Sequence, residues 1–270
     1  MSRERIKADL AIIGAGAAGL VTASGAAQLG RKVVLFEAGE MGGDCLNYGC
    51  VPSKAILTAA HKVHAIREAG KYGVSVGEPS VDFAKVRETI QSAITTIEPN
   101  DSQERFEGFG VRVVREYAHF VSEDTVASDS IEVKAKRIVV ATGTRAFIPP
   151  VEGLAEAPYL TNETIWSLET LPEHLIVMGA GPIGMELGQA FRRLGSEVTI
   201  IEAGEPLARF EPEHAGLVTD QLMADGVTLH TGKSAARVQS GDAGITLTLS
   251  DGEQVTGSHL LVATGRKPVL

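Results

Sequence analysis

The chain has 270 residues, which is long enough for one or two domains with a substantial hydrophobic core. Its composition, with 44% hydrophobic and 22% charged residues, is typical of a globular protein. The formal net charge of −9 argues against a nucleic-acid partner, because phosphate backbones need a basic surface. Two cysteines cannot build the disulfide framework of a small secreted protein, so a reducing compartment, the cytoplasm, is expected.

The N-terminal segment is similar to a secretory signal, because basic residues precede an apolar stretch and then small residues. However, Asp9 lies at the boundary of the apolar stretch, and Gly14, Gly16 and Gly19 interrupt it. A signal peptide or a membrane span would favour leucine at such positions. We therefore expect neither a cleaved signal nor a membrane partner.

Two segments of the chain repeat one another. LAIIGAGAAGLVTASGAAQLGRKVVLFEAGE begins at Leu10, and LIVMGAGPIGMELGQAFRRLGSEVTIIEAGE begins at Leu175. The two align without a gap and share three glycines and a final acid. These are Gly14, Gly16, Gly19 and Glu37 in the first copy, and Gly179, Gly181, Gly184 and Glu202 in the second. Each copy predicts a strand, a glycine turn, a helix and a second strand that ends in the acid.

This pattern has a specific physical meaning. The first glycine permits a tight turn, the second lets the backbone approach a pyrophosphate, and the third allows close packing of helix on strand. The acid, about 20 residues downstream, can accept hydrogen bonds from an adenosine ribose. The sequence therefore predicts an α/β fold with two Rossmann-like dinucleotide-binding domains. The alternative is a duplication in which only one copy still binds.

A second, shorter sequence repeat marks the remaining part of each domain. IVVATGT (138–144) and LLVATGR (260–266) both end an apolar strand on Ala-Thr-Gly. The alternating segments that precede them, VRVVREYAHF with DSIEV and ITLTLSDGEQVT, predict a small antiparallel sheet beside each parallel sheet. Pro149 and Pro150 interrupt regular structure, so we expect domains at residues 1–150 and 151–270.

Two helices are expected between the cysteines and the first Ala-Thr-Gly. The apolar face of the first consists of Ile56, Ala60, Val63 and Ile66. That of the second consists of Phe83, Val86, Ile90, Ile94 and Ile97, and Pro99 is expected to end the helix. His61 and His64 could in principle share a metal, but no cysteine or carboxylate nearby completes a ligand set, so a solvated face is favoured.

Both cysteines, Cys45 and Cys50, fall in GGDCLNYGCVPSK. They are either two structural thiols in a loop or a dithiol that opens and closes as a redox pair. Pro52 at a helix start would leave Cys50 near the positive end of the helix dipole, where a thiolate is stabilised.

With these motifs in this order, the chain resembles the class I pyridine nucleotide–disulfide oxidoreductases, such as dihydrolipoamide dehydrogenase and mercuric reductase. The resemblance implies FAD in the first domain, a nicotinamide nucleotide in the second, and a homodimeric full-length protein. It also implies electron flow from NAD(P)H through the flavin to a Cys45–Cys50 disulfide, and on to a small or protein-bound disulfide substrate.

The resemblance assigns roles residue by residue. Cys50 matches the charge-transfer thiolate beside the flavin, Cys45 the interchange thiol, and Lys54 with Glu186 an ion pair beside flavin N5. The residues implied in cofactor binding are Gly14, Gly16, Gly19, Glu37, Gly43, Asp44, Lys54, Ala118, Thr142 and Gly143, then Gly179, Gly181, Gly184, Glu202 and Gly265. Asp44 stands where the family usually has threonine, so its charge should weaken pyrophosphate binding unless it turns away or is paired.

Two expectations concern the cofactors. Glu202 favours NADH over NADPH, and Arg209, seven residues further on, is expected to lie too far away to hold a 2′-phosphate. The family continues beyond Ala-Thr-Gly-Arg with the closing part of the FAD domain and a dimerisation domain that supplies a His–Glu base. We therefore expect these 270 residues alone to retain little FAD and to show no lipoamide-dependent NADH oxidation.

The substrate stays open at this point. A dihydrolipoamide dehydrogenase-like reaction is the first choice, a mercuric reductase-like enzyme the second, and a non-catalytic FAD- and NAD-binding fragment the third. In air-exposed protein we expect Cys45 and Cys50 to form a disulfide.

Overall fold

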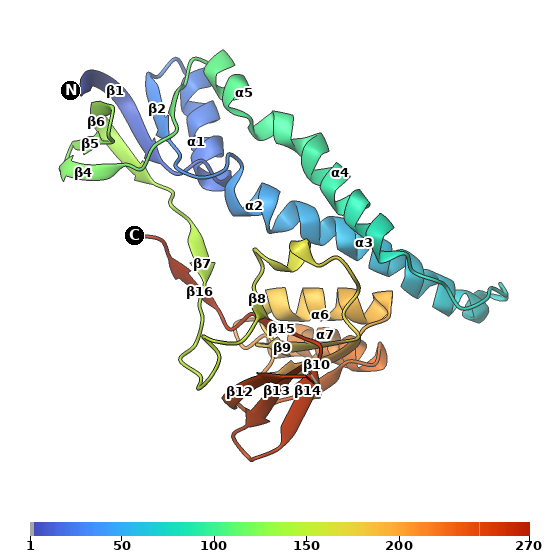
Figure 1. The fold of residues 1–270 in the computed structure, drawn as a ribbon. Coiled ribbons are helices and arrows are strands. Elements are labelled where there is room, and N and C mark those ends of the chain that lie inside the picture. The colour runs from blue at the N-terminus through green and yellow to red at the C-terminus, as the bar shows by residue number, and fades with distance from the viewer. Residues whose placement is uncertain (1–2, 243) are drawn as a thin grey trace. The chain divides into compact units, whose positions relative to one another are not determined.

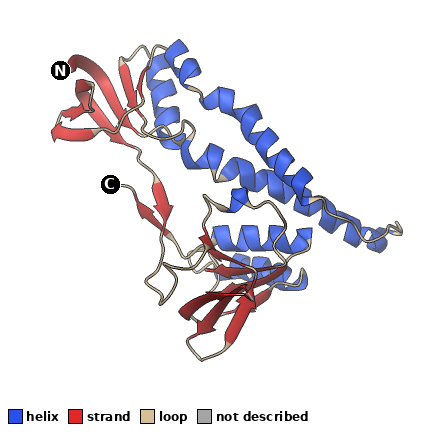
Figure 2. Cartoon of the chain, in the orientation of Figure 1, coloured by secondary structure: helices blue, strands red, loops and turns tan. Residues whose placement is uncertain are grey.

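The computed structural model describes residues 3–242 and 244–270 (Figure 1). The chain divides into two compact units. Unit 1 contains the described residues up to Val51 together with Ser92–Arg145 and Pro268–Leu270, and unit 2 contains Pro52–Gln91 and Ala146–Lys267. Helices and strands occur in both (Figure 2). The predicted α/β class, with parallel sheets and small antiparallel sheets, is confirmed.

Unit 1 is built around a six-stranded sheet in the order β3-β2-β1-β6-β5-β4. Its strands are β1 (Glu4–Ile13), β2 (Val33–Phe36), β3 (Arg112–Val114), β4 (His119–Ser122), β5 (Thr125–Ala127) and β6 (Ile131–Val140). The first repeat forms β1, helix α1 (Ala17–Gln28) and β2, and β1 pairs in parallel with both β2 and β6. All four residues of β2 are buried, which fits a central parallel strand covered on both faces.

The prediction for the alternating segments of unit 1 is wrong in two details. Arg112–Val114 is not part of an antiparallel sheet but the parallel edge strand β3. The antiparallel strands β4 and β5 are not a separate sheet either, because β5 pairs with the first residues of β6. The cause is the length of β6, which pairs with β1 on one side and extends the same sheet through β5 on the other.

Unit 2 contains a five-stranded parallel sheet in the order β11-β10-β9-β15-β8. The strands are β8 (Tyr159–Leu160), β9 (His174–Met178), β10 (Glu197–Ile201), β11 (Thr228–His230) and β15 (His259–Val262). Helices α6 (Pro182–Leu194) and α7 (Pro212–Ala224) and the short helix η2 (Ile165–Ser167) accompany it. As predicted, β12 (Ala235–Gly241), β13 (Gly244–Leu249) and β14 (Gln254–Gly257) form a separate antiparallel sheet.

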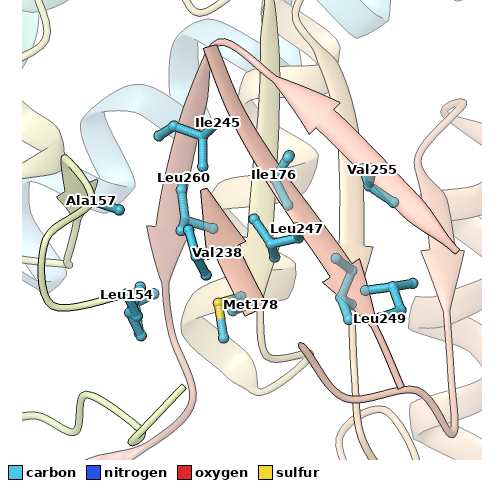
Figure 3. Close-up of a cluster of buried hydrophobic side chains, with 12 residues drawn as sticks. Leu154, Ala157, Ile176, Met178, Val238, Ile245, Leu247, Leu249, Val255 and Leu260 are labelled. Atoms are coloured by element: carbon cyan, nitrogen blue, oxygen red, sulfur yellow. The ribbon is translucent and has the colours of Figure 1, made fainter. Parts of the chain in front are cut away.

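One hydrophobic cluster of unit 2 lies between its two sheets. Figure 3 shows Ile176 and Leu260 of the parallel sheet in one cluster with Val238 and Leu247 of the antiparallel sheet. Along β13 every second residue is buried, so the alternation in ITLTL marks the face that meets the parallel sheet. The strands β7 (Thr144–Ala146) and β16 (Arg266–Pro268) lie where the chain passes between the units.

The helical segment before and after residue 70 contains α2 (Gly43–Asn47), α3 (Cys50–Glu68), η1 (Ala69–Tyr72), α4 (Phe83–Asp101) and α5 (Gln103–Gly108). The predicted apolar face of α3 is buried at Ile56, Ala60 and Val63, but Ile66 is 38% exposed. The expectation that Pro99 ends α4 is wrong, because the helix includes Pro99 and stops at Asp101. A proline in the last turn removes one backbone hydrogen bond, and Ser102 then caps α5 by accepting from the Arg105 N–H.

Residues 52–91 group with unit 2 because their side chains pack on α6. The rings of Phe83 and Phe191 lie 6.1 Å apart between centroids, and Arg67 donates to the carbonyl oxygen of Arg193 at 2.7 Å. The two units therefore differ from the expected domains 1–150 and 151–270, because residues 52–91 belong to unit 2. Within the described ranges, no helix has both the length and the apolarity needed to cross a membrane.

Candidate dinucleotide sites and redox-active cysteines

The first glycine turn is closed by backbone alone. Gly14, directly after β1, has φ of 106°, and a Cβ added there would lie 2.3 Å from the carbonyl oxygen of Ala141. A Cβ on Gly19 would lie 1.8 Å from the carbonyl oxygen of Gly14. Both separations are far below van der Waals contact, so only glycine fits at either position. Ala141 begins the first Ala-Thr-Gly, which explains why that motif ends β6.

The second turn repeats this geometry. Gly179 has φ of 104°, and its added Cβ would lie 2.5 Å from the carbonyl oxygen of Ala263. A Cβ on Gly184 would lie 2.0 Å from the carbonyl oxygen of Gly179. In each unit the turn leaves a central parallel strand whose neighbours lead to opposite halves of the sheet. Crevices at such switch points, at the carboxyl ends of the strands, are where α/β proteins bind ligands.

The middle glycines are not crowded by the crossing strands. No atom would lie within 4 Å of a Cβ on Gly181, and the nearest to a Cβ on Gly16 would be 3.9 Å away. Gly143 and Gly265, which end the two Ala-Thr-Gly motifs, are likewise open and have positive φ. Helices α1 and α6 begin next to Gly16 and Gly181 with no side-chain cap. Free N–H groups beside open backbone fit the pyrophosphate of a dinucleotide.

The acids at the ends of β2 and β10 lie against these turns. The Glu37 carboxylate accepts hydrogen bonds from the N–H groups of Ala15 and Gly39, both at 2.6 Å. Glu202 accepts from the N–H groups of Ala180 at 2.8 Å and Gly204 at 2.9 Å. A carboxylate has about four lone-pair sites, so each acid keeps acceptor capacity for ribose hydroxyl groups.

Unit 2 has a cavity of about 770 Å³ whose lining includes the predicted residues Gly179, Gly181, Glu202 and Gly265. This volume is in the range of cofactor sites. Gly184 does not line the cavity, because it lies beneath the turn against Gly179.

Arg209 lines the same cavity as Glu202, a placement that its separation by seven residues did not suggest. Whether it can hold a 2′-phosphate stays a prediction. The reason for the placement is the backbone of Leu207, which has φ of 51° and donates its N–H to the carbonyl oxygen of Ala180 at 2.9 Å. That contact returns residues 207–210 to the glycine turn. The sequence carries no clear signal for it, because a left-handed leucine is uncommon.

In unit 1 the loop that carries the cysteines packs directly on the first glycine turn. The Gly42 N–H donates to the carbonyl oxygen of Ala15 at 3.0 Å, and Gly16 and Gly42 form a β-bridge. A Cβ on Gly43 would lie 2.7 Å from the Cα of Gly16. The glycine pair before the cysteines is therefore needed to bring helix α2, with Cys45, against the turn.

Cys45 and Cys50 are present as two thiols, Cys45 partly buried and Cys50 exposed at the first residue of α3. The pKa of Cys45 is raised to about 11, first by burial and then by a side-chain hydrogen bond to Cys50 and by the charge of Cys50, with a smaller contribution from Asp101. A hydrogen bond from the Cys50 N–H lowers the pKa of Cys45. With a pKa of about 11, Cys45 therefore keeps its proton at neutral pH. The disulfide of air-exposed protein stays a prediction.

The remaining residues implied for the first cofactor lie in unit 1. Asp44 is exposed, and its Oδ2 lies 3.3 Å from the position that a Cβ on Gly49 would occupy, so its carboxylate turns along its own loop. Ala118 is half-buried and packs against the hydrophobic cluster of the sheet. Thr142 is half-buried between Ala141 and Gly143.

Unit 2 brings Lys54 and Glu186 together. The Lys54 Nζ lies 2.8 Å and 3.0 Å from the two carboxylate oxygens of Glu186. The side chains are 64% and 33% exposed, respectively. An ion pair of this exposure contributes at most about 1 kcal/mol to stability, so it is not a folding device.

The two histidines of α3, His61 and His64, have different neighbours. His61 lines a second cavity of unit 2, of about 370 Å³, whereas the Nδ1 of His64 lies 3.5 Å from Oδ1 of Asp225. Among the residues that the structure describes, no three histidine, cysteine, aspartate or glutamate side chains form a group that could hold a metal ion.

Comparison with known proteins identifies the family. Residues 8–270 match the family model described as pyridine nucleotide-disulphide oxidoreductase. The chain belongs to this family. Its members use FAD and NAD(P)H, which fits the two open glycine turns and their acids.

Several curated relatives match nearly the whole chain. A mercuric reductase of Streptomyces lividans is 37% identical, covering 97% of this chain and 57% of the relative. A dihydrolipoyl dehydrogenase of Geobacillus stearothermophilus is 35% identical with the same two coverages. A solved structure, the HOCl-induced flavoprotein disulfide reductase RclA from Escherichia coli, superposes with a TM-score of 0.82 at 25% identity, covering 97% of this chain and 57% of that one. The chain thus spans little more than half the length of these relatives.

The glycine geometry predicts that alanine costs much more stability at Gly179 than at Gly181. Gly179→Ala forces a side chain into a left-handed, crowded site and is expected to destabilise unit 2 by about 1–3 kcal/mol in urea unfolding. Gly181→Ala meets open space and should cost less than about 1 kcal/mol. The same Gly181→Ala should weaken NADH binding at least about tenfold, because its methyl group occupies the path of the phosphates. Equal loss of stability in both variants would contradict this geometry.

A second prediction concerns the thiol pair. In pre-reduced protein, Cys50→Ser removes the partner thiol and its charge, so the pKa of Cys45 should fall from about 11 while burial keeps it above its ordinary value. The measurement is the pH dependence of iodoacetamide alkylation at Cys45, followed by peptide mass spectrometry. Asp101→Asn is the matched control and should lower the pKa much less. An unchanged midpoint in Cys50→Ser would show that the pair is not coupled.

Proposed function

We propose that this chain belongs to a flavin-dependent disulfide oxidoreductase that passes electrons from NADH through FAD to the Cys45–Cys50 pair and on to a disulfide substrate. One observation supports the proposal above all: the cysteine loop packs on the first glycine turn through Gly42 and Gly43. A thiol pair fixed against a dinucleotide turn is suited to exchange electrons with the bound cofactor. Two structural thiols would need no such contact.

When bound, the two cofactors supply hydride transfer from nicotinamide to flavin. The chain contributes phosphate binding at the N-termini of α1 and α6, and hydrogen bonds from Glu37 and Glu202 to the ribose hydroxyls. Lys54, held by Glu186, places a positive charge that the family resemblance assigns to the flavin ring, where it would favour electron acceptance.

The thiols then act in sequence. Cys45 gives up its proton and its sulfur attacks one sulfur of the substrate disulfide, so that a mixed disulfide forms and one substrate thiolate leaves. The Cys50 thiolate next attacks the Cys45 sulfur, which closes the Cys45–Cys50 disulfide and releases the second substrate thiolate. The substrate disulfide gains two electrons from the thiol pair and two protons, one released by Cys45 and one taken from solvent. The high pKa of Cys45 means that its deprotonation needs a base, consistent with the His–Glu pair that the family supplies beyond this chain.

For the substrate, a dithiol of the lipoamide type remains the first candidate. Mercuric ion is the second, because a thiolate pair is a soft ligand set and mercuric reductases are among the relatives of 36–37% identity. The difference from the 35% identity of the dihydrolipoyl dehydrogenase is too small to decide. A homodimeric full-length protein in the cytoplasm is part of the same proposal, and a binding fragment without turnover is the alternative.

The proposal is tested by anaerobic titration of the full-length protein with NADH. Bleaching of the flavin absorbance is expected, and wild type should consume about one equivalent more than Cys45→Ser, because only the intact disulfide stores a second electron pair. Denatured thiol counts should rise by about two per chain in wild type alone. A flavin absorbance that NADH does not change would favour the alternative, a protein that binds the cofactors without turnover. Lipoamide and mercuric chloride as alternative oxidants then separate the two enzymatic candidates.

The nucleotide choice gives a further prediction. NADH is expected to bind at least about tenfold more tightly than NADPH, or about 1.4 kcal/mol, because Glu202 repels a 2′-phosphate. Glu202→Ala should reduce this difference in affinity, mainly by weakening the binding of NADH. Arg209→Ala should increase the difference by weakening the binding of NADPH, since Arg209 is a cation in the same cavity. Equal dissociation constants in wild type, measured by calorimetry, would refute the assignment.

A further inference from the structure

Unit 2 contains a buried charge that the proposed reaction does not use. The Asp225 side chain is only 3% exposed and follows directly after α7. An unpaired carboxylate in such a place would be costly, so its partners indicate what it does.

The partners come from three helices. Oδ2 of Asp225 accepts from Arg193 Nε at 2.8 Å and from Gln189 Nε2 at 2.7 Å, both on α6. Oδ1 accepts from Gln221 Nε2 of α7 at 3.0 Å and lies 3.5 Å from the Nδ1 of His64 on α3. We call Asp225, Arg193, Gln189, Gln221 and His64 the Asp225 hub.

The hub is charged and firmly held. Burial alone would raise the pKa of Asp225, but hydrogen bonds from Arg193, Gln221 and Gln189 and the Arg193 charge outweigh it, so the pKa is lowered. Arg193 is itself only 9% exposed. A desolvated pair with several hydrogen bonds tolerates little change in geometry, because moving one partner leaves the other charge buried without compensation.

Helix α3 is tied to this hub twice. His64 faces Asp225, and Arg67 donates through Nη1 to the carbonyl oxygen of Arg193 at 2.7 Å. On α6, Glu186, Gln189 and Arg193 are spaced by three and four residues and so share one face. The face of α6 that meets the hub therefore also carries Glu186, the partner of Lys54 on α3.

We propose that the Asp225 hub is a positioning device that fixes α3 on α6 and thereby holds Lys54 against Glu186. The Lys54–Glu186 pair cannot position itself, because an ion pair with a 64% exposed lysine barely repays the side-chain entropy that it costs. His64 and Arg67 are positioning residues, and they act on Lys54 through the seating of α3. The consequence for the flavin rests on the proposed function, whereas the positioning itself does not.

The deciding variant is His64→Ala/Arg67→Ala in the full-length protein, because both side chains are about one-third exposed and their loss leaves the buried pair Asp225–Arg193 intact. Lys54 acetylation by acetic anhydride, followed by peptide mass spectrometry relative to Lys62 and Lys85, should become about two- to fivefold faster. Glu186→Gln removes the ion pair itself and so gives the upper limit of the Lys54 acetylation rate. The matched control is Glu78→Gln, which removes the exposed partner of Arg67 Nε at 2.7 Å but leaves the hub untouched, and it should change nothing.

The flavin midpoint potential is the second readout. It should shift in the His64/Arg67 variant in the same direction as in Lys54→Met, and combining the changes should add no further shift, because the hub acts through Lys54. Additive shifts, or unchanged Lys54 labelling, would overturn the proposal. If labelling responds but Lys54→Met leaves the potential unchanged, the hub stands and the proposed role of Lys54 beside the flavin fails.

Discussion

Each unit depends on one crossing of backbone over backbone. Gly14 lies so close to the carbonyl of Ala141, and Gly179 to that of Ala263, that no side chain fits between them. This crossing brings the carboxyl ends of two neighbouring parallel strands together and starts the following helix with its N–H groups free. The acid of the next strand can then reach an N–H within the turn, as Glu37 and Glu202 do. The binding surface is therefore a consequence of strand packing rather than an addition to it.

The same turn acquires different neighbours in the two units. In unit 1 the space beside Gly16 receives Gly42 and Gly43, which bring a pair of thiols to the turn. In unit 2 the corresponding space beside Gly181 is open, and the segment around Leu207 closes the side of the cavity instead. One repeated motif thus has a pair of thiols beside it in unit 1 and an open cavity beside it in unit 2. The difference lies in a few loop residues, since the strands and helices repeat.

Much of this could be predicted from the sequence, because glycine spacing and a terminal acid report directly on backbone geometry. The two turns, both Ala-Thr-Gly motifs and the Lys54–Glu186 contact follow from such patterns, the last through family resemblance. Features that depend on tertiary packing could not be predicted. Arg112–Val114 alternates like an antiparallel strand yet pairs in parallel, Pro99 lies inside a helix, and Arg209 reaches the cavity through the left-handed Leu207. Asp225 gives no local signal at all, because its partners lie on three separate helices.

The long strand β6 has a consequence for how the chain folds. Glu4 pairs with Ile131, so β1 must wait for a partner that lies more than a hundred residues further along the chain. Helix α3 likewise meets its docking surface on α6 only after a similar stretch has been made. At a synthesis rate of about 5–20 residues per second, both segments stay without these partners for roughly 5–25 seconds. Contacts of such long range slow folding, so the edge of β1 and the inner face of α3 stay uncovered in the nascent chain until their partners have been made.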